Sequence, residues 1–252
     1  MSMDPLLERS EENLLREDER LLQRDDTKVG EGANTSAHRN HYNQIIKSRP
    51  YDPESDDAGM NPSEKENLLK QLDRAVWTDV GKREVDAPFE YMLVRMERGI
   101  EHAEAVDRYS PNVDQLVAED LDMFFDMREE GVTYRDFKPD NIGYFPGDGD
   151  CQGFWSDPDS YNWETVVARP IDVMDEGLKR EENLSNTEMA KVLDIYIGDV
   201  PGEEGIVDLY TVSTEDAERA VLNYLGLDGE VTGDPYMDMR RVFHKEGTIK
   251  SN

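Results

Sequence analysis

Residues 132–145 read VTYRDFKPDNIGYF, and this stretch decides how the rest of the chain is interpreted. Before it, apolar residues recur at helical spacing over 113–130, which predicts an amphipathic helix that ends at Gly131. The stretch itself is predicted to be a short strand, a loop and a second strand. Charged and amide side chains are therefore gathered in one loop between a helix and a strand.

The loop resembles the catalytic loop of protein kinases, whose motif is H-R-D-x-x-x-x-N. Arg135 and Asp136 occupy the second and third positions of the motif, and Asn141 follows at the spacing that the motif requires. Lys138 and the proline after it match the Lys-Pro pair common in the Ser/Thr branch, while Tyr134 stands in place of the usual histidine. The chain is therefore identified as similar to the protein-kinase-like superfamily.

The resemblance implies transfer of the γ-phosphate of ATP, with Mg²⁺ as the metal. Asp136 would orient the acceptor hydroxyl and take its proton, and Lys138 would neutralise charge that develops on the transferred group. Asn141 would turn its amide oxygen toward a magnesium ion. Such a loop suits this reaction because phosphoryl transfer depends on positioned charges more than on covalent partners.

A second magnesium ligand is expected at the end of the next strand, where the family has the aspartate of D-F-G. Apolar residues over 165–173 predict that strand, and Asp172 stands at its end. Asp175, in an Asp-Glu-Gly sequence just beyond, is a second candidate. Residues 146–163 are rich in Gly, Asp and Pro and are predicted to be an acidic insertion before the strand.

The N-terminal half contains a weaker match to the nucleotide-binding part of a kinase. Gly30 and Gly32 lie in a Gly-x-Gly-x-x-Thr sequence, which resembles the glycine-rich loop over the ATP phosphates. Lys47 ends a Gln-Ile-Ile-Lys sequence, which resembles the V-A-I-K whose lysine holds the α and β phosphates.

A helix is predicted to begin shortly before Glu66, which completes a capping-box pattern ahead of an apolar run. The resemblance implies that Glu66 pairs with Lys47, with Glu64 as the alternative partner. Glu97 follows a strand predicted at 89–96 and would line the edge of the adenine through its backbone.

These segments stand in the order found in the kinase family, and the resemblance implies an α+β fold with two lobes in one kinase-like domain over 27–252. A small strand-rich N-lobe would span about 27–98 and a reduced helical C-lobe about 99–252. Residues 1–26 are predicted to form a helical extension, whose paired leucines give an apolar stripe that could pack on the domain or form a dimer. Within the C-lobe, amphipathic helices are further predicted at 186–197 and 214–225.

The 252-residue chain is strongly acidic, with 58 Asp and Glu against 28 Lys and Arg and a formal net charge of −30. Such a surface repels the phosphates of nucleic acids and of anionic membranes, so neither is expected as a partner. The acidic excess, with arginine more frequent than lysine, indicates adaptation to a salt-rich cytosol, so the chain is expected to come from a haloarchaeon or from a virus of one. An acidic mimic of nucleic acid and a protein that binds a basic partner are the alternatives. At about 1 M salt the Debye length is about 3 Å, so repulsion among carboxylates is largely screened.

A cytoplasmic location is expected on three grounds. Cys151 is the only cysteine, which excludes an intramolecular disulfide. No apolar run reaches the roughly 20 residues that span a bilayer. The N-terminal residues lack the basic and apolar regions of a signal peptide.

Three functions remain open. A Ser/Thr-type protein kinase is the leading prediction, because Lys138 resembles that branch and is normally absent from small-molecule phosphotransferases. A small-molecule phosphotransferase is the second, because only about 80 residues follow Asp172 and could form a platform for a peptide. A catalytically silent module that binds ATP is the third, because Tyr134 and Thr35 depart from the family pattern.

Overall fold

The computed structural model of the chain combines α-helices with short antiparallel sheets, and so has the predicted α+β class. The chain divides into two compact units, with the described strands before residue 98 in the first and the described elements after residue 99 in the second. The structure describes residues 26, 28–31, 36–39, 45–51, 79–84, 90–96, 100–109, 112–146, 166–171, 178–180, 184–198, 204–227 and 231–246. The predicted N-terminal helix, the helix around Glu66 and the insertion beyond Pro146 lie outside these residues.

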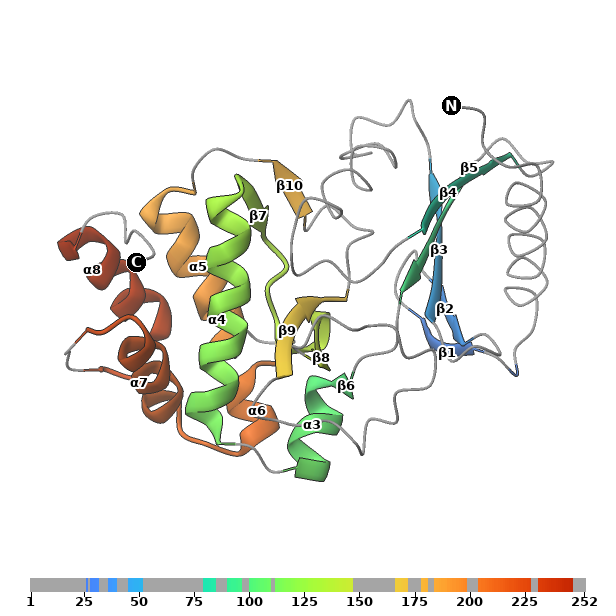
Figure 1. The fold of residues 1–252 in the computed structure, drawn as a ribbon. Helices are drawn as coiled ribbons and strands as arrows, with labels where there is room; N and C mark the ends of the chain where they lie inside the picture. The colour runs from blue at the N-terminus through green and yellow to red at the C-terminus, as the bar shows by residue number, and fades with distance from the viewer. Residues whose placement is uncertain are drawn as a thin grey trace. The chain divides into compact units, whose positions relative to one another are not determined.

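The first unit contains a five-stranded antiparallel sheet, with strand order β1-β2-β3-β5-β4 (Figure 1). A hairpin forms around the predicted glycine sequence: Gly30 pairs with Ala37, and the register shifts between Lys28 and Gly30. The strand predicted at 89–96 is confirmed as β5, which is paired on both of its edges. The five strands are β1 Lys28–Glu31, β2 Ser36–Arg39, β3 Ile45–Tyr51, β4 Asp79–Glu84 and β5 Glu90–Met96.

The second unit contains two small antiparallel sheets. One has the strand order β6-β8-β9, and the other pairs β10 with β7. Their strands are β6 Ile100–Glu101, β7 Val132–Tyr134, β8 Ile142–Pro146, β9 Val166–Pro170 and β10 Leu178–Arg180.

Helix α4, Val113–Glu129, is the long helix predicted before the loop, and it organises the second unit. It begins after Asn112, whose side-chain oxygen accepts a hydrogen bond of 2.8 Å from the amide of Asp114. It is followed by Gly131, whose φ of +75° is a left-handed backbone conformation that suits glycine. The helix contacts β7 and β9 on one side and helix α7, Thr214–Tyr224, on the other (Figure 1).

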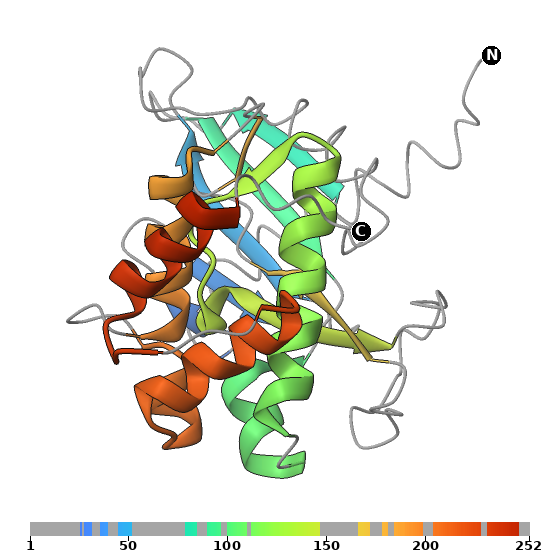
Figure 2. The same cartoon turned by 90° about the vertical axis from the view of Figure 1, so that its left-hand side faces the viewer.

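The described part of the second unit contains four further helices. The helices predicted at about 186–197 and 214–225 are confirmed as α5 and α7. Helices α5 and α8 lie side by side (Figure 2). None of the helices in the described part of the chain is long and apolar enough to cross a membrane. Besides α4 and α7, the helices are α3 His102–Tyr109, α5 Asn186–Ile197, α6 Ile206–Tyr210 and α8 Pro235–Glu246.

Two glycines bring the end of α5 against the start of α6. Gly198 ends α5 with a φ of +103°, and a Cβ atom added to it would lie 2.8 Å from the Cα atom of Gly205. Gly205 is the residue before the first turn of α6. The two backbones therefore touch at a distance that no larger residue permits at either position.

Candidate active site

The loop predicted to be catalytic joins β7 to β8 and contains a single 3₁₀ turn over Pro139–Asn141. Lys138 is extended just before the turn, and Pro139 begins it with a fixed φ angle. The amide of Asn141 closes the turn with a hydrogen bond of 2.9 Å to the carbonyl of Lys138. The chain thus reverses direction, and the side chain of Asn141 returns toward Asp136.

Asn141 holds Asp136 through two hydrogen bonds from one amide group. Its Nδ2 atom donates a bond of 2.6 Å to the carboxylate Oδ2 of Asp136 and a bond of 2.9 Å to the backbone carbonyl of the same residue. Both acceptors require a donor, so the NH₂ of Asn141 must face Asp136. The amide oxygen of Asn141 takes part in neither bond, and it is the atom that a metal would use.

Lys138 lies beside Oδ1, the other carboxylate oxygen of Asp136. Its Nζ atom is 3.7 Å from Oδ1 of Asp136. The side chain of Asp136 is 44% exposed and that of Lys138 is 21% exposed, so solvent and a ligand can reach both groups. An ion pair with this exposure contributes little to stability. A carboxylate with a cation beside it in an open loop is better suited to act on a ligand than to stabilise the fold.

Tyr134, which stands in place of the motif's histidine, supports the loop through a hydrogen bond from its side chain. Tyr134 is fully buried, and its hydroxyl donates a hydrogen bond of 3.0 Å to the backbone carbonyl of Asn141. The amide of Ile171, just after β9, donates a second bond of 2.9 Å to the same oxygen. Asn141 is therefore fixed both to the strand before the loop and to the end of β9.

An aromatic side chain from inside the loop fixes its other half. Phe137, between Asp136 and Lys138, is fully buried. Its ring is stacked on that of Tyr196 from α5, with centroids 4.5 Å apart, and lies 4.8 Å from that of Phe124 on α4. The backbone between the two charged residues is thus anchored in the core of the second unit.

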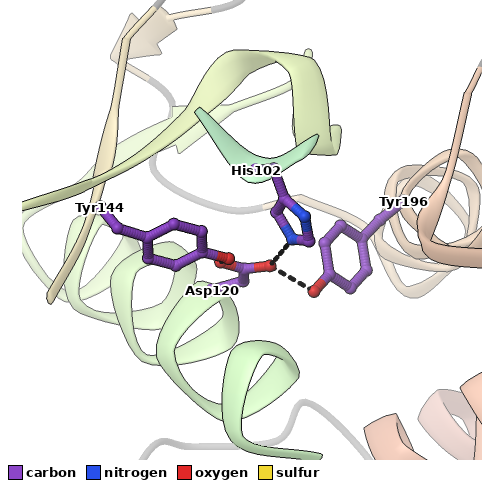
Figure 3. A network of polar contacts seen from close by, with 4 residues as sticks. All are labelled: His102, Asp120, Tyr144 and Tyr196. Atoms are coloured by element: carbon purple, nitrogen blue, oxygen red, sulfur yellow. Dashed lines mark hydrogen bonds and ion pairs between the residues drawn. The ribbon is translucent and has the colours of Figure 1, made fainter. Parts of the chain in front are cut away.

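A buried carboxylate beneath the loop was not predicted from the sequence. Asp120 on α4 is fully buried and accepts hydrogen bonds from Tyr144 on β8 and from Tyr196 on α5, and it lies within hydrogen-bond distance of His102 on α3 (Figure 3). The ring of Tyr210 on α6 packs edge-on against His102, with centroids 5.8 Å apart. The signal in the sequence was an acidic residue within the apolar stripe of the predicted helix, next to Leu121.

The tyrosines around this carboxylate remain hydrogen-bond donors over a wide pH range. Burial, and after it the charge of Asp120, raises the pKa of Tyr144 well above that of an exposed tyrosine. The same two causes, in the same order, raise the pKa of Tyr196. Both phenols therefore stay protonated at neutral pH and donate to Asp120.

The other predicted site residues fall in two groups. Gly30 lies in the β1–β2 hairpin, and Lys47 on β3 pairs with Ala37 and Val94 across the sheet of the first unit. Strand β9 ends at Pro170, before the end predicted at Asp172. The remaining predicted site residues, Gly32, Glu66, Glu97 and Asp172, lie outside the described residues, as do the alternatives Glu64 and Asp175.

The described residues contain no group of three or more His, Cys, Asp and Glu side chains that could hold a metal ion. The proposed magnesium ligands are an amide, which is not among those residue types, and Asp172. No family model matches the chain, and no curated protein is similar to it in sequence.

Proposed function

We propose that this chain is a protein-kinase-like phosphotransferase that transfers the γ-phosphate of ATP to a hydroxyl group. One observation carries the proposal: the carboxylate of Asp136 is held by the amide of Asn141 on one oxygen and lies beside the ammonium of Lys138 on the other. The resemblance to the kinase loop assigns roles in the reaction to the same three residues. A Ser or Thr side chain of a protein is the favoured acceptor because of Lys138.

Each residue of the loop would have one task in the reaction. Asp136 would accept a hydrogen bond from the acceptor hydroxyl, orient it and take its proton as the new bond to phosphorus forms. Lys138 would offset the negative charge of the transferred group. The amide oxygen of Asn141 and the carboxylate of Asp172 would hold magnesium, which neutralises the phosphates of ATP when it is bound.

We also propose that the two units are the two lobes of a kinase-like fold. The first unit would bind the nucleotide through the hairpin that contains Gly30 and the strand that contains Lys47, and its antiparallel sheet supports that assignment. The second unit would carry the catalytic loop. The predicted pairing of Lys47 with Glu66 is part of this proposal. We place the reaction in a salt-rich cytosol, because the net charge of −30 suits that solvent.

The test is transfer of labelled γ-phosphate in multimolar KCl with MgCl₂, with generic proteins and a panel of hydroxylated metabolites as acceptors. Asp136→Ala should lower the rate by about 10²- to 10⁴-fold, the range for loss of a general base. Asp140→Ala is the matched control, because Asp140 is an exposed carboxylate of the same loop with no proposed role. It should retain the activity of the original chain.

The outcomes separate the candidate functions. Labelling that Asp136→Ala leaves undiminished would overturn the assignment of the site. Labelling of metabolites but not of proteins would favour a small-molecule phosphotransferase. A rise in melting temperature with ATP and Mg²⁺, without transfer to any acceptor, would favour a silent binding module.

A further inference from the structure

The two carboxylate oxygens of Asp120 form hydrogen bonds with different parts of the chain. Oδ1 accepts a hydrogen bond of 2.7 Å from the hydroxyl of Tyr144. Oδ2 accepts one of 2.5 Å from the hydroxyl of Tyr196 and lies 3.1 Å from Nε2 of His102 (Figure 3). The carboxylate is thus a firm connection between α4, β8, α5 and α3.

The hydrogen bond from Tyr196 to Oδ2 connects Asp120 to the first half of the catalytic loop, which contains Asp136 and Lys138. The hydroxyl of Tyr196 is held by Asp120, while its ring is stacked on Phe137 with an interplanar angle of 23°. Phe137 lies between Asp136 and Lys138 in the chain, and all of its side chain is buried. A tyrosine ring that is held at its hydroxyl cannot tilt freely, so the position of Phe137 is fixed as well.

The hydrogen bond from Tyr144 to Oδ1 connects Asp120 to the second half of the loop, which ends at Asn141. Tyr144 is fully buried in β8, the strand that begins directly after Asn141. Holding the hydroxyl of Tyr144 fixes β8 against α4 immediately beyond the turn that returns Asn141 to Asp136. The backbone of Asn141 receives its other supports from Tyr134 and Ile171.

We propose that Asp120 is a positioning residue for the catalytic loop: through Tyr196 it sets the place of Asp136 and Lys138, and through Tyr144 the place of Asn141. This role for Asp120 rests on the proposed function of the loop, although the geometry that it controls can be measured without any activity. Asp120 does not touch the reacting groups. It acts because one rigid carboxylate serves both halves of the loop.

The chain offers a matched control on the same helix. Tyr224 on α7 donates a hydrogen bond of 2.6 Å to Oδ1 of Asp122, and its ring is stacked on Phe125 with centroids 6.1 Å apart. Removing this hydroxyl is the same chemical change as in Tyr196→Phe, in a tyrosine that also bonds an aspartate of α4. Neither Asp122 nor Phe125 has a direct contact with the loop among those described above, although Phe125 lies edge-on against Phe124, the neighbour of Phe137. Tyr224 is less buried than Tyr196, so this variant controls for the loss of a tyrosine–aspartate hydrogen bond on α4. An effect on the loop should be absent from it.

The experiment follows the side-chain NH₂ of Asn141 in the ¹⁵N-labelled full chain, assigned by its loss in Asn141→Asp. In Tyr196→Phe and Tyr144→Phe, these protons should shift and should exchange with water about tenfold faster, as for the loss of one buried hydrogen bond. In Tyr224→Phe they should keep their shifts and exchange rates. Using two variants on different oxygens keeps the test valid if one of them does not fold.

Equal shifts and exchange rates for Asn141 in folded Tyr196→Phe, Tyr144→Phe and Tyr224→Phe would overturn the positioning role. Where transfer activity is measured, the first two variants should lower kcat with the KM for ATP unchanged, and Tyr224→Phe should alter neither. A change at Asn141 in a chain that transfers no phosphate would support the positioning role and count against the proposed function. The two failures are therefore distinguishable.

Discussion

The hydroxyl of Tyr134 lies 3.0 Å from the backbone carbonyl of Asn141 and donates a hydrogen bond to it. Tyr134 is the residue that departs from the kinase motif, and its side chain is fully buried. The substitution thus places a hydrogen-bond donor beneath the loop that would carry the metal ligand. The departure from the motif is compatible with a well-held catalytic loop.

Tyr134→Phe should lower the free energy of unfolding by about 1 kcal/mol, the net value of one intramolecular hydrogen bond. The loss is limited because the carbonyl of Asn141 keeps its bond from the amide of Ile171. Urea unfolding in concentrated KCl would measure it. Tyr134→His, which restores the residue of the motif but leaves space in the core, should cost more than Tyr134→Phe. An unchanged stability in Tyr134→Phe would show that the bond contributes nothing.

Glu218 on α7 should make stability depend on pH. Its side chain is fully buried, and burial, followed by the charge of Asp238, raises the pKa of Glu218 to about 7. Below pH 4.5 the group is protonated in both states. Between pH 4.5 and about 7 the unfolded chain releases a proton that the folded chain retains, so stability falls as pH rises.

Glu218→Gln removes this dependence, so the variant should gain stability relative to the original chain as pH rises from 5 to 8. The gain should be at most about 3 kcal/mol, because each pKa unit corresponds to about 1.4 kcal/mol. Urea unfolding at both pH values, at one salt concentration, is the measurement. Glu204→Gln, at an exposed position, controls for the loss of one charge. A difference between the original chain and Glu218→Gln that is the same at pH 5 and pH 8 would contradict the expectation.

Two glycines with left-handed backbones should differ in their tolerance of alanine. A Cβ atom on Gly131 would meet no atom within 4 Å, whereas one on Gly198 would lie 2.8 Å from the Cα atom of Gly205. Gly131→Ala should therefore cost about 1 kcal/mol from backbone strain alone. Gly198→Ala should cost about 3 kcal/mol or more, because two backbones must also separate. Melting temperatures would rank the variants, and an equal loss in both would refute the close approach.

Stability should also rise with salt. With a net charge of −30, the folded chain concentrates carboxylates whose repulsion acts over about 10 Å at 0.1 M salt and about 3 Å at 1 M salt. The melting temperature should therefore increase with KCl from 0.1 to 2 M. Sucrose at matched osmolality, which does not screen charge, should raise it much less. A constant or falling melting temperature would argue against adaptation to a salt-rich cytosol.

The helices with strong apolar periodicity could be predicted from the sequence. Helices α4, α5 and α7 each bury a regular stripe and begin at a residue that caps them. The proximity of Asp136 and Asn141 could be predicted as well, because the spacing between them is that of the motif. In both cases the signal lies within a few neighbouring residues.

Helix α8 was not predicted, although its start carries a usual signal. Asp234 accepts a hydrogen bond of 3.0 Å from the amide of Met237, and a proline follows Asp234 at the first helical position. The apolar pattern is weak, however, because Met237 is 52% exposed, whereas Met239 and Phe243 are buried. Strand β10 is three residues long and contains a lysine and an arginine. It therefore has no apolar pattern from which its pairing with β7 could be predicted.

The sequence marks Asp120 only by its place in the apolar stripe of the helix and gives no sign of its partners. An aspartate within a helix is ordinarily interpreted as part of the solvated face. Its three hydrogen-bond partners lie 18, 24 and 76 residues further or earlier along the chain, beyond the range of any local pattern. Only the packing of the helix against distant segments shows that this carboxylate is buried and fully used.

The contact between Gly198 and Gly205 gives the helical layer a second connection. Helices α5 and α6 are in contact there through space as well as through the intervening chain. Any side chain at Gly198 or Gly205 would push the end of one helix away from the start of the other, so the pair acts as a spacer of fixed, minimal width.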